Sequence, residues 1–402
     1  MGTYPTLRRR PSNTPMFKPP AAPGARETDA SGADVARLTA LQALIEREIA
    51  GDGGWMPFER FMSLALYAPG LGYYSATEPI ATPAGSGDFI TAPELSPLFA
   101  RALARQIRQA LQATGTREVW EFGPGRGTLA AQLLRELGDD VDAYHLVDLS
   151  GTLRACQQMA VEACGTALAA KARWHDQLPA ALEGVLVGNE VLDAMPVRLV
   201  GFDGQQWLER GVIVDRTAPT PRFAWADRVP PAPLAPPVHA QDFPAGSVTE
   251  LHPTADGWVR TLAAHLRRGA MFLIDYGFPE AEYYLPQRHQ GTLVCHRRHL
   301  VDADPLSDVG NKDITAHVNF TGIALSGQDA GLDVLGYTSQ ARFLMNCGLL
   351  DDLRDADPRV IAPAQKLLSE HEMGELFKVI GFAKGTVFDA LGFAQGDRSH
   401  TL

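Results

Sequence analysis

The segment from residue 117 to residue 190 alternates short apolar runs with stretches whose apolar residues repeat at helical spacing. The runs REVWEF, AYHLVDLS, ARWHD and GVLVGNE have the length and residue types of buried strands. Between them, TLAAQLLREL, GTLRACQQMAVEAC and a stretch near QLPAALEG predict helices. Strands that alternate with helices form parallel sheets with right-handed crossovers. The sequence therefore predicts an α/β fold with a Rossmann-like, doubly wound sheet.

Other patterns surround this core. The Pro-rich start of the chain predicts a disordered tail, and two amphipathic patterns with a long Gly-rich loop predict a helical and lid region. The run VRLVGFDGQQWLERGVIV and the Pro-rich stretch after it predict an inserted hairpin and linker. The core resumes with the helix ADGWVRTLAAHLRRG, where Gly269 suits a C-cap, and with the strand AMFLIDYG. The predicted division is a tail at 1–34, a helical and lid region at 35–115, a core domain at 116–390 with an insertion at about 197–247, and a C-terminal tail at 391–402.

Composition argues against several classes of function. The formal net charge of −11 disfavours nucleic-acid and anionic-membrane partners, which require clustered Lys and Arg. The four cysteines form no Cys-x-x-Cys pair, and Cys295, His296 and His299 lack a fourth ligand, so we expect no metal. No stretch approaches the roughly 18 apolar residues of a membrane span. We expect a cytoplasmic protein in a bacterium, or a protein of the mitochondrial matrix in a eukaryote.

The loop EFGPGRGTLA follows the first predicted strand. Its spacing is G-x-G-x-G, at Gly123, Gly125 and Gly127, whereas dinucleotide fingerprints are spaced G-x-G-x-x-G/A. Glu121, just before the loop, is unfavourable beside a pyrophosphate and favourable beside a cation. The spacing therefore disfavours NAD and FAD. A tight strand-to-helix turn with acidic capping residues is the alternative explanation for the same pattern.

S-adenosyl-L-methionine matches this pattern because it has no phosphate and carries a positive sulfonium and an amino group. Asp148 ends the second predicted strand, where a carboxylate can accept hydrogen bonds from ribose hydroxyls. Asp176 follows the third strand, where it either reaches the adenine amino group or caps a helix. The predicted cofactor site consists of Glu121, Gly123, Gly125, Gly127, Asp148 and Asp176.

Several stretches in a fixed order between about residue 55 and residue 390 resemble the MidA-type methyltransferases. This family includes the mitochondrial complex I assembly-factor protein arginine methyltransferase and its bacterial relatives. The matching stretches include FMSLALYAPGLGYYS, GDFITAPELSPLFA, EFGPGRGTLA, GNEVLDAMPV, LIDYG, DITAHVNF, TSQARFLMNCGL and MGELFKVIGFAKG.

This resemblance implies a class I S-adenosylmethionine-dependent methyltransferase fold. From the mitochondrial member it also implies symmetric dimethylation of an arginine in a protein substrate, a complex I subunit. Relatives commonly carry Asp where this chain has Asn319, so a charge-dependent role of that residue would be absent here.

Arginine is a demanding acceptor because its guanidinium stays protonated, and carboxylates can orient it through forked hydrogen bonds. In NEVLDAMP, Glu190 and Asp193 would share a face if the turn is helical, and they are the predicted substrate carboxylates. Asn189 occupies the place where class I amino-methylating enzymes keep a polar residue, so we expect it to orient the target nitrogen. The alternative makes Asn189 a helix cap and Asp193 a first-turn partner of the helix dipole.

The family motif GDFITAPELS suggests a loop that closes over the cofactor, with Asp88 and Thr91 as cofactor-binding residues. The same stretch would also suit a capping segment before the next helix. His317 is more typical of a structural residue than of a general base. Three functions remain open: a protein arginine methyltransferase, a methyltransferase of another acceptor, and a cofactor-binding assembly chaperone with little catalysis.

Overall fold

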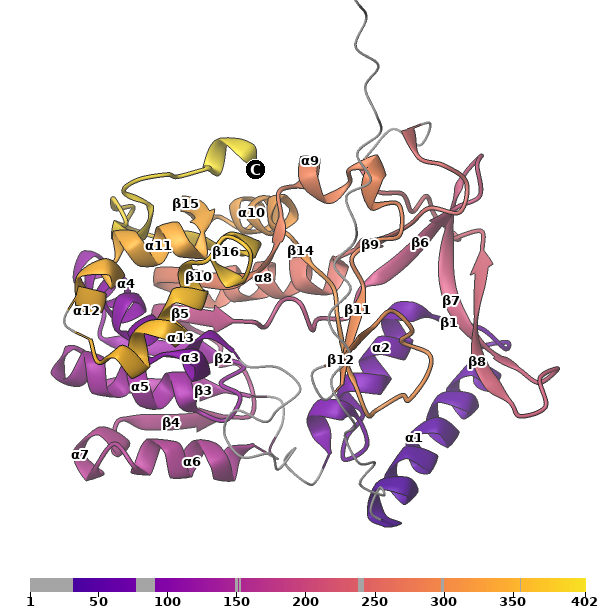
Figure 1. Ribbon diagram of the computed structural model, residues 1–402, viewed down its shortest axis with the longest axis horizontal. Helices are drawn as coiled ribbons and strands as arrows, with labels where there is room; N and C mark the ends of the chain where they lie inside the picture. Colours follow the sequence, from indigo (N-terminus) through magenta and orange to yellow (C-terminus); the bar gives the residue numbers. More distant parts are fainter. Residues whose placement is uncertain are drawn as a thin grey trace, which may run out of the picture.

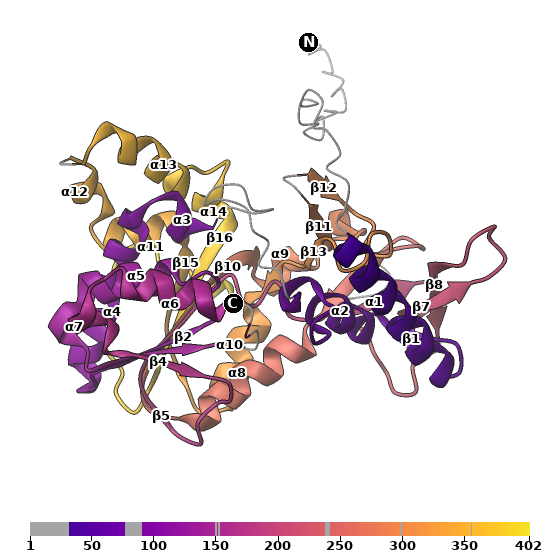
Figure 2. The same ribbon diagram turned by 90° about the horizontal axis from the view of Figure 1, so that it is seen from below.

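The computed structural model contains two parts that lie side by side, as both views show (Figure 1, Figure 2). One part is built on a long, mostly parallel sheet, and the other combines α1 (Gly32–Gly51) and α2 (Phe58–Tyr67) with smaller antiparallel sheets. Within the described ranges, no helix is both long and apolar enough to cross a membrane. The structure describes residues 32–76, 91–148, 151, 153–237, 242–297, 300–354 and 356–402.

The large sheet has the strand order β15-β16-β10-β5-β2-β3-β4, with β14 beside β10. The strands from β10 to β4 run parallel, and β16 lies antiparallel between β10 and β15. The chain order reverses between β2 and β5, and open sheets bind ligands beyond the carboxyl ends of such strands. This topology confirms the predicted doubly wound fold. The strands are β2 (Glu118–Phe122), β3 (Ala143–Val147), β4 (Ala172–His175), β5 (Leu182–Asn189), β10 (Leu266–Phe278), β14 (Val318–Asn319), β15 (Asp333–Ser339) and β16 (Phe377–Lys384).

Each central strand is buried on both faces, because successive side chains point to opposite sides of a sheet. Val119 and Val185 belong to one hydrophobic core, and their neighbours Trp120 and Leu186 belong to another. This double burial explains why the strands read as continuous apolar runs. The first core is covered by α4 (Pro97–Thr114), α5 (Thr128–Leu137), α6 (Arg154–Glu162), α11 (Gln340–Asn346), α12 (Leu349–Arg354) and α13 (Pro358–Leu368), and the second by α8 (Pro253–His265) and α10 (Phe320–Asp329).

The second part joins the N-terminal helices to the predicted insertion at about 197–247 and also to strands β9, β11, β12 and β13, which lie beyond the predicted insertion. Residues of α1, α2, β6, β7, β11 and β13 share one hydrophobic core, which includes Leu41, Phe61, Leu199 and Ile314. The N-terminal region and the inserted strands are therefore packed as one unit. Its strands are β1 (Met56–Pro57), β6 (Arg198–Phe202), β7 (Trp207–Asp215), β8 (Arg222–Arg228), β9 (Val248–Leu251), β11 (Val294–Arg297), β12 (Leu300–Asp302) and β13 (Asp313–Thr315).

Two predicted local features are wrong. No helix forms near QLPAALEG, because β5 already begins at Leu182 and the short stretch before it contains Pro179. Gly269 is not a C-cap: α8 ends at His265, and Gly269 lies inside β10, opposite Gly184 of β5. A Cβ on Gly269 would overlap the Gly184 carbonyl oxygen. This glycine therefore permits close approach of two strands.

The predicted C-terminal tail packs onto the large sheet. Phe393 is buried in the first core, and the Asp397 carboxylate accepts a hydrogen bond from the Tyr337 backbone at 3.0 Å. Arg398 forms an ion pair with Glu375 at 2.5 Å. These contacts place residues 391–402 against β15 and α14 (Met373–Leu376). The predicted N-terminal tail lies outside the described residues except for residues 32–34, which begin α1.

Candidate active site

The glycine loop joins β2 to α5 at the carboxyl edge of the sheet. Gly123, Gly125 and Gly127 all have positive φ, at 63°, 51° and 83°. A Cβ on Gly127 would lie 2.8 Å from the Gln157 Cα, and one on Gly123 would lie 2.9 Å from the Val191 Cγ2. A Cβ on Gly125 would meet nothing within 4 Å. Two of the glycines therefore permit tight packing, and Gly125 leaves the backbone uncovered for close approach of a ligand.

Gln157 of α6 connects the loop to the predicted ribose carboxylate. Its Nε2 donates to the Asp148 Oδ2 at 2.7 Å and to the Gly125 carbonyl at 3.0 Å. Its Oε1 accepts from the Trp174 Nε1 at 3.1 Å. Gln157 is fully buried, whereas Asp148 is half-buried at the end of β3. The carboxylate is therefore held in one orientation beside the loop. Sequence reasoning missed Gln157, because only the packing of α6 against the loop reveals its partners.

Glu121 has a buried carboxyl group that faces the next strand. Its Oε2 accepts from the Tyr144 hydroxyl at 2.6 Å. Burial raises the pKa of Glu121 to about 7, and the negative charge of Asp148 adds to the rise while the Tyr144 hydrogen bond opposes it. A positively charged ligand nearby would favour the ionised form. A role of Glu121 in favouring a cationic ligand over a phosphate stays a prediction.

The other predicted cofactor residues lie farther apart. Asp176 follows β4, the edge strand of the sheet; its side chain is 76% exposed and forms an ion pair with Arg154. Thr91 precedes the short helix α3 (Ala92–Leu95) and makes no side-chain capping hydrogen bond. Asp88 lies outside the described residues. The structure thus gathers Glu121, the glycines and Asp148, and leaves Asp176 at the rim.

Glu190 directly follows β5 with an unusual backbone conformation, φ 55°. Its Oε1 accepts from the Asn189 Nδ2 at 2.9 Å, and its carboxyl group also accepts from the backbone N–H of Ala92. Burial raises the pKa of Glu190 to about 8, and the charge of Asp193 adds to the rise. The segment around Thr91 therefore lies against Glu190, and the predicted substrate role of Glu190 stays a prediction.

The turn after β5 is not helical, so the expected shared helical face of Glu190 and Asp193 does not exist. Asp275 of β10 explains why: its Oδ2 accepts from the backbone N–H groups of Val191, Leu192 and Asp193 at 3.1, 2.9 and 3.3 Å. These groups wrap around a carboxylate instead of starting a helix. The alternative roles as helix cap and first-turn residue are excluded for the same reason.

Three carboxyl groups nevertheless share one buried region. Asp193 accepts a hydrogen bond from the Tyr276 hydroxyl, and burial raises its pKa to about 6. Burial, followed by the charges of Asp193 and Glu190, raises the pKa of Asp275 well above its ordinary range. Carboxyl groups that are held together without a compensating cation favour binding of a positive group.

Residues of the second part complete this region. The Tyr67 hydroxyl donates to the Ala194 carbonyl at 2.8 Å, and the Tyr74 hydroxyl donates to the Asp313 Oδ2 at 2.7 Å. Burial raises the pKa of Tyr67 above its usual range, and the charges of Asp313, Asp193 and Asp148 follow in that order. Tyr67 is thus close enough to feel the charges of Asp313, Asp193 and Asp148. The sequence did not identify Tyr67 or Asp313, because their position depends on how α2 and β13 pack against the large sheet.

His317 lies flat on Phe278, with ring centroids 5.3 Å apart and an interplanar angle of 1°. Burial lowers its pKa to about 4, and the charges of Arg288 and Lys378 lower it further. The ring is therefore neutral at pH 7 and is packed like a structural residue.

Asn319 serves as the N-cap of α10, where its Oδ1 accepts from the Gly322 backbone at 3.2 Å. Asn and Asp are about equally good at this position. The exchange of the family's usual Asp for Asn therefore preserves the cap.

A cavity of about 260 Å³ lies beside Asn319, and none of its lining residues belongs to the predicted site. Its polar lining includes Arg198, His252, Asp256, Glu280, Tyr284 and Asn319.

The residues around the glycine loop fit a cofactor that carries positive charge and no phosphate. Gly125 offers uncovered backbone, Asp148 offers an oriented carboxylate, and Glu121 disfavours a pyrophosphate. S-adenosylmethionine has these properties, as the sequence pattern predicted.

Comparisons with known proteins agree with this reading of the crevice. A family model described as "Putative S-adenosyl-L-methionine-dependent methyltransferase" matches residues 102–338. A Burkholderia thailandensis protein crystallised with S-adenosyl-homocysteine is 50% identical with a TM-score of 0.86, over 93% of this chain and 99% of that chain.

Curated relatives include the protein arginine methyltransferase NDUFAF7, mitochondrial, of Danio rerio, which is 26% identical over 83% of this chain and 88% of the relative. The Homo sapiens protein of the same name is 27% identical over 79% of this chain and 77% of the relative. These matches confirm the predicted family, fold and cofactor. The chain belongs to this family of S-adenosyl-L-methionine-dependent methyltransferases.

Proposed function

We propose that the protein methylates an arginine side chain of a protein substrate. The observation that carries this proposal is the cluster of the half-buried Glu190 with the buried Asp193 and Asp275, in which each carboxyl group has a raised pKa. Gly123 packs against Val191 in the same turn, so the glycine loop and the carboxyl groups adjoin. A guanidinium is the cationic side chain that carboxylates bind through forked hydrogen bonds.

Asn189 has the acceptor that the target nitrogen requires. Its Nδ2 is used by Glu190, whereas its Oδ1 is buried and has no hydrogen-bond partner among the described residues. A buried acceptor without a partner is costly, so a donor from the substrate stabilises it. We assign Asn189 to orient the nitrogen that accepts the methyl group.

Glu190 is mostly protonated at pH 7 in the absence of substrate, since its pKa is about 8. An incoming guanidinium lowers the pKa of Glu190, so the carboxyl group releases its proton to solvent. The ionised carboxylate would then hold positive charge away from the attacking nitrogen. The cofactor, when bound, would supply a methyl group carried on a positively charged sulfur.

The relatives named protein arginine methyltransferase support arginine as the acceptor. The resemblance to the complex I assembly factor makes a subunit of respiratory complex I, or an equivalent protein, the first substrate to test. The eukaryotic relatives have mitochondrial names, and we place this protein in the mitochondrial matrix of a eukaryote or the cytoplasm of a bacterium.

The test is transfer of tritiated methyl groups from S-adenosylmethionine into an extract of host cells that lack the gene, followed by acid hydrolysis and separation of amino acids. We expect label in methylated arginines, and a strong loss of label with Glu190→Gln at unchanged affinity for S-adenosyl-homocysteine. Label in another residue or in small molecules would assign a different acceptor. Tight cofactor binding without any label would instead support the assembly chaperone.

A further inference from the structure

We infer that Tyr74 and Asp313 form one wall of the acceptor pocket, opposite Asp193, and that this wall selects a planar cationic side chain. Arg37 of α1 positions the wall. The inference rests on the proposed function and deepens it, because it adds the second part of the molecule to the substrate site.

Two hydrogen bonds attach this wall to the turn after β5. The Tyr67 hydroxyl donates to the Ala194 carbonyl at 2.8 Å, and the Ala316 backbone donates to the Asp193 carbonyl at 2.9 Å. Ala316 directly follows β13, which begins at Asp313. The segments that carry the wall are therefore attached to the backbone of the turn that carries Asp193.

The wall combines aromatic rings with negative charge. Tyr67 and Tyr74 stack with centroids 5.6 Å apart at an interplanar angle of 19°, and the Tyr74 hydroxyl donates to Asp313 at 2.7 Å. Asp313 and Asp193 both act on the Tyr67 and Tyr74 hydroxyl groups electrostatically. Rings beside carboxylates form a favourable environment for a guanidinium, which stacks on aromatic faces and binds carboxylates in its own plane.

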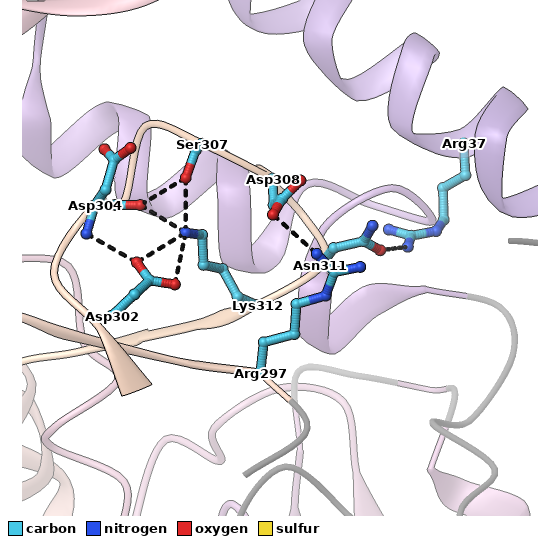
Figure 3. A network of polar contacts seen from close by, with 8 residues as sticks. All are labelled: Arg37, Arg297, Asp302, Asp304, Ser307, Asp308, Asn311 and Lys312. Carbon is cyan, nitrogen blue, oxygen red and sulfur yellow. Dashed lines mark hydrogen bonds and ion pairs between the residues drawn. The ribbon is translucent and has the colours of Figure 1, made fainter. Parts of the chain in front are cut away.

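Arg37 joins the two segments that carry this wall. Its Nη1 donates to the Leu71 carbonyl at 2.7 Å and to the Gly310 carbonyl at 3.1 Å, and its Nη2 donates to the Asn311 Oδ1 at 3.1 Å, a contact drawn in Figure 3. Leu71 lies just before Tyr74, and Asn311 lies just before Asp313. The Arg37 guanidinium thus fixes the distance between the two segments close to the point where the Tyr74 and Asp313 side chains meet.

Lys312 shapes the loop on the other side of the same segment. Its side chain is 1% exposed, and its Nζ donates to both carboxylate oxygens of Asp302, to the Asp304 carbonyl and to the Ser307 Oγ at 2.6–3.1 Å (Figure 3). These contacts hold the chain in place directly before Asp313. Because the Lys312 side chain is itself buried, its replacement would disturb the packing of this loop, so Arg37 is the better residue to test.

The first experiment compares Tyr74→Phe, Asp313→Asn and Arg37→Met with Arg60→Met in the tritium transfer assay. Arg60 of α2 binds Glu48 of α1 at 2.8 Å and is exposed, so its substitution perturbs the same two helices without touching the wall. We expect the three wall variants to raise the extract concentration for half-maximal rate about tenfold, as loss of a charge-assisted contact does. Affinity for S-adenosyl-homocysteine should match wild type in Arg60→Met and Tyr74→Phe, and the thermal midpoint of Arg60→Met should also match wild type. If Tyr74→Phe and Asp313→Asn need the same extract concentration as wild type for half-maximal rate, the proposed wall is wrong. If Arg37→Met and Arg60→Met need the same extract concentration, the proposed role of Arg37 is wrong.

The second experiment requires no acceptor. Sinefungin carries an ammonium group where S-adenosylmethionine carries the methylated sulfur, so the ratio of its affinity to that of S-adenosyl-homocysteine reports the charge that faces the acceptor side. Calorimetry should show that Asp313→Asn lowers this ratio several-fold, whereas Asp227→Asn, a substitution in the distant β8 pair with Arg210, leaves it unchanged. An unchanged ratio in Asp313→Asn would refute the wall. If the wild-type protein labels no arginine, the proposed function is wrong. The affinity ratio still tests whether Asp313 contributes negative charge to the acceptor side.

Discussion

Gln157 shows how one buried amide organises a cofactor site. It binds the Asp148 carboxylate, the Gly125 carbonyl and the Trp174 indole at once, and so couples α6, the glycine loop and β4. A side chain of similar size without hydrogen-bonding groups would remove this contact from both the Asp148 carboxylate and the Gly125 carbonyl. The orientation of the ribose carboxylate is therefore a property of α6 as much as of β3.

We predict that Gln157→Leu and Asp148→Ala each weaken binding of S-adenosyl-homocysteine about tenfold, equivalent to roughly 1.4 kcal/mol. Titration calorimetry measures this directly. Gln112→Leu, at an exposed position of α4, is the matched control and should bind like wild type. Wild-type affinity in Asp148→Ala would remove Asp148 from the cofactor site.

Glu190 makes stability depend on pH. Its pKa is about 8 in the folded protein and near 4.5 when exposed, so the folded state holds a proton that the unfolded state releases between these values. Stability therefore falls as pH rises from about 4.5 to about 8, by up to a few kcal/mol in total. Glu121, with a pKa of about 7, acts in the same direction.

The substitution Glu190→Gln removes the ionisation and should reduce the loss of stability between pH 5 and pH 8. Urea unfolding at the two pH values measures the difference. Glu183→Gln, which affects an exposed pair with Arg268, should keep the wild-type pH dependence. Equal pH dependence in wild type and Glu190→Gln would show that Glu190 is ionised throughout.

Among the elements, the central strands were predictable and several connections were not. Strands β2, β3, β4, β5 and β10 were recognisable because burial on both faces makes each one a continuous apolar run. The turn after β5 was not predictable, since its shape is imposed by Asp275, which is distant in sequence. Tyr67 and Asp313 were not identified from the sequence for the same reason, because their contacts join separate parts of the chain.

Gly269 is the clearest case at this scale. We predict that Gly269→Ala destabilises the protein by about 3 kcal/mol or more, because its Cβ would overlap the Gly184 carbonyl where β5 and β10 pair. Gly257→Ala, inside α8 with nothing within 4 Å of its Cβ, should stabilise by about 0.5–1 kcal/mol. Chemical denaturation of both variants provides the comparison. A mild effect of Gly269→Ala would mean that the two strands can separate locally at little cost.

At the scale of the whole molecule, the N-terminal helices and the inserted strands form one accessory unit that faces the cofactor domain. We propose that this unit serves acceptor binding, because α2 carries Tyr67 and the loop after it carries Tyr74. The unit depends on close contact between β1 and β7: a Cβ on Gly211 would overlap the Met56 carbonyl and the Trp55 ring. A substitution at Gly211 should therefore disturb the acceptor site, although Gly211 is not part of that site.

We predict that Gly211→Ala lowers methyl transfer at least tenfold while affinity for S-adenosyl-homocysteine changes less than about twofold, which corresponds to under roughly 0.4 kcal/mol. The predicted cofactor residues Asp148 and the glycine loop, with Gln157 beside them, belong to the other part, so cofactor binding should survive. Gly201→Ala is the matched control in the neighbouring strand β6, because its Cβ would meet only the ends of the Asp227 and Arg210 side chains, at 3.1 and 3.3 Å. It should retain most of the transfer activity. Parallel loss of cofactor binding and transfer in Gly211→Ala would show that the two parts are not separable, and acceptor binding could then not be assigned to the accessory unit.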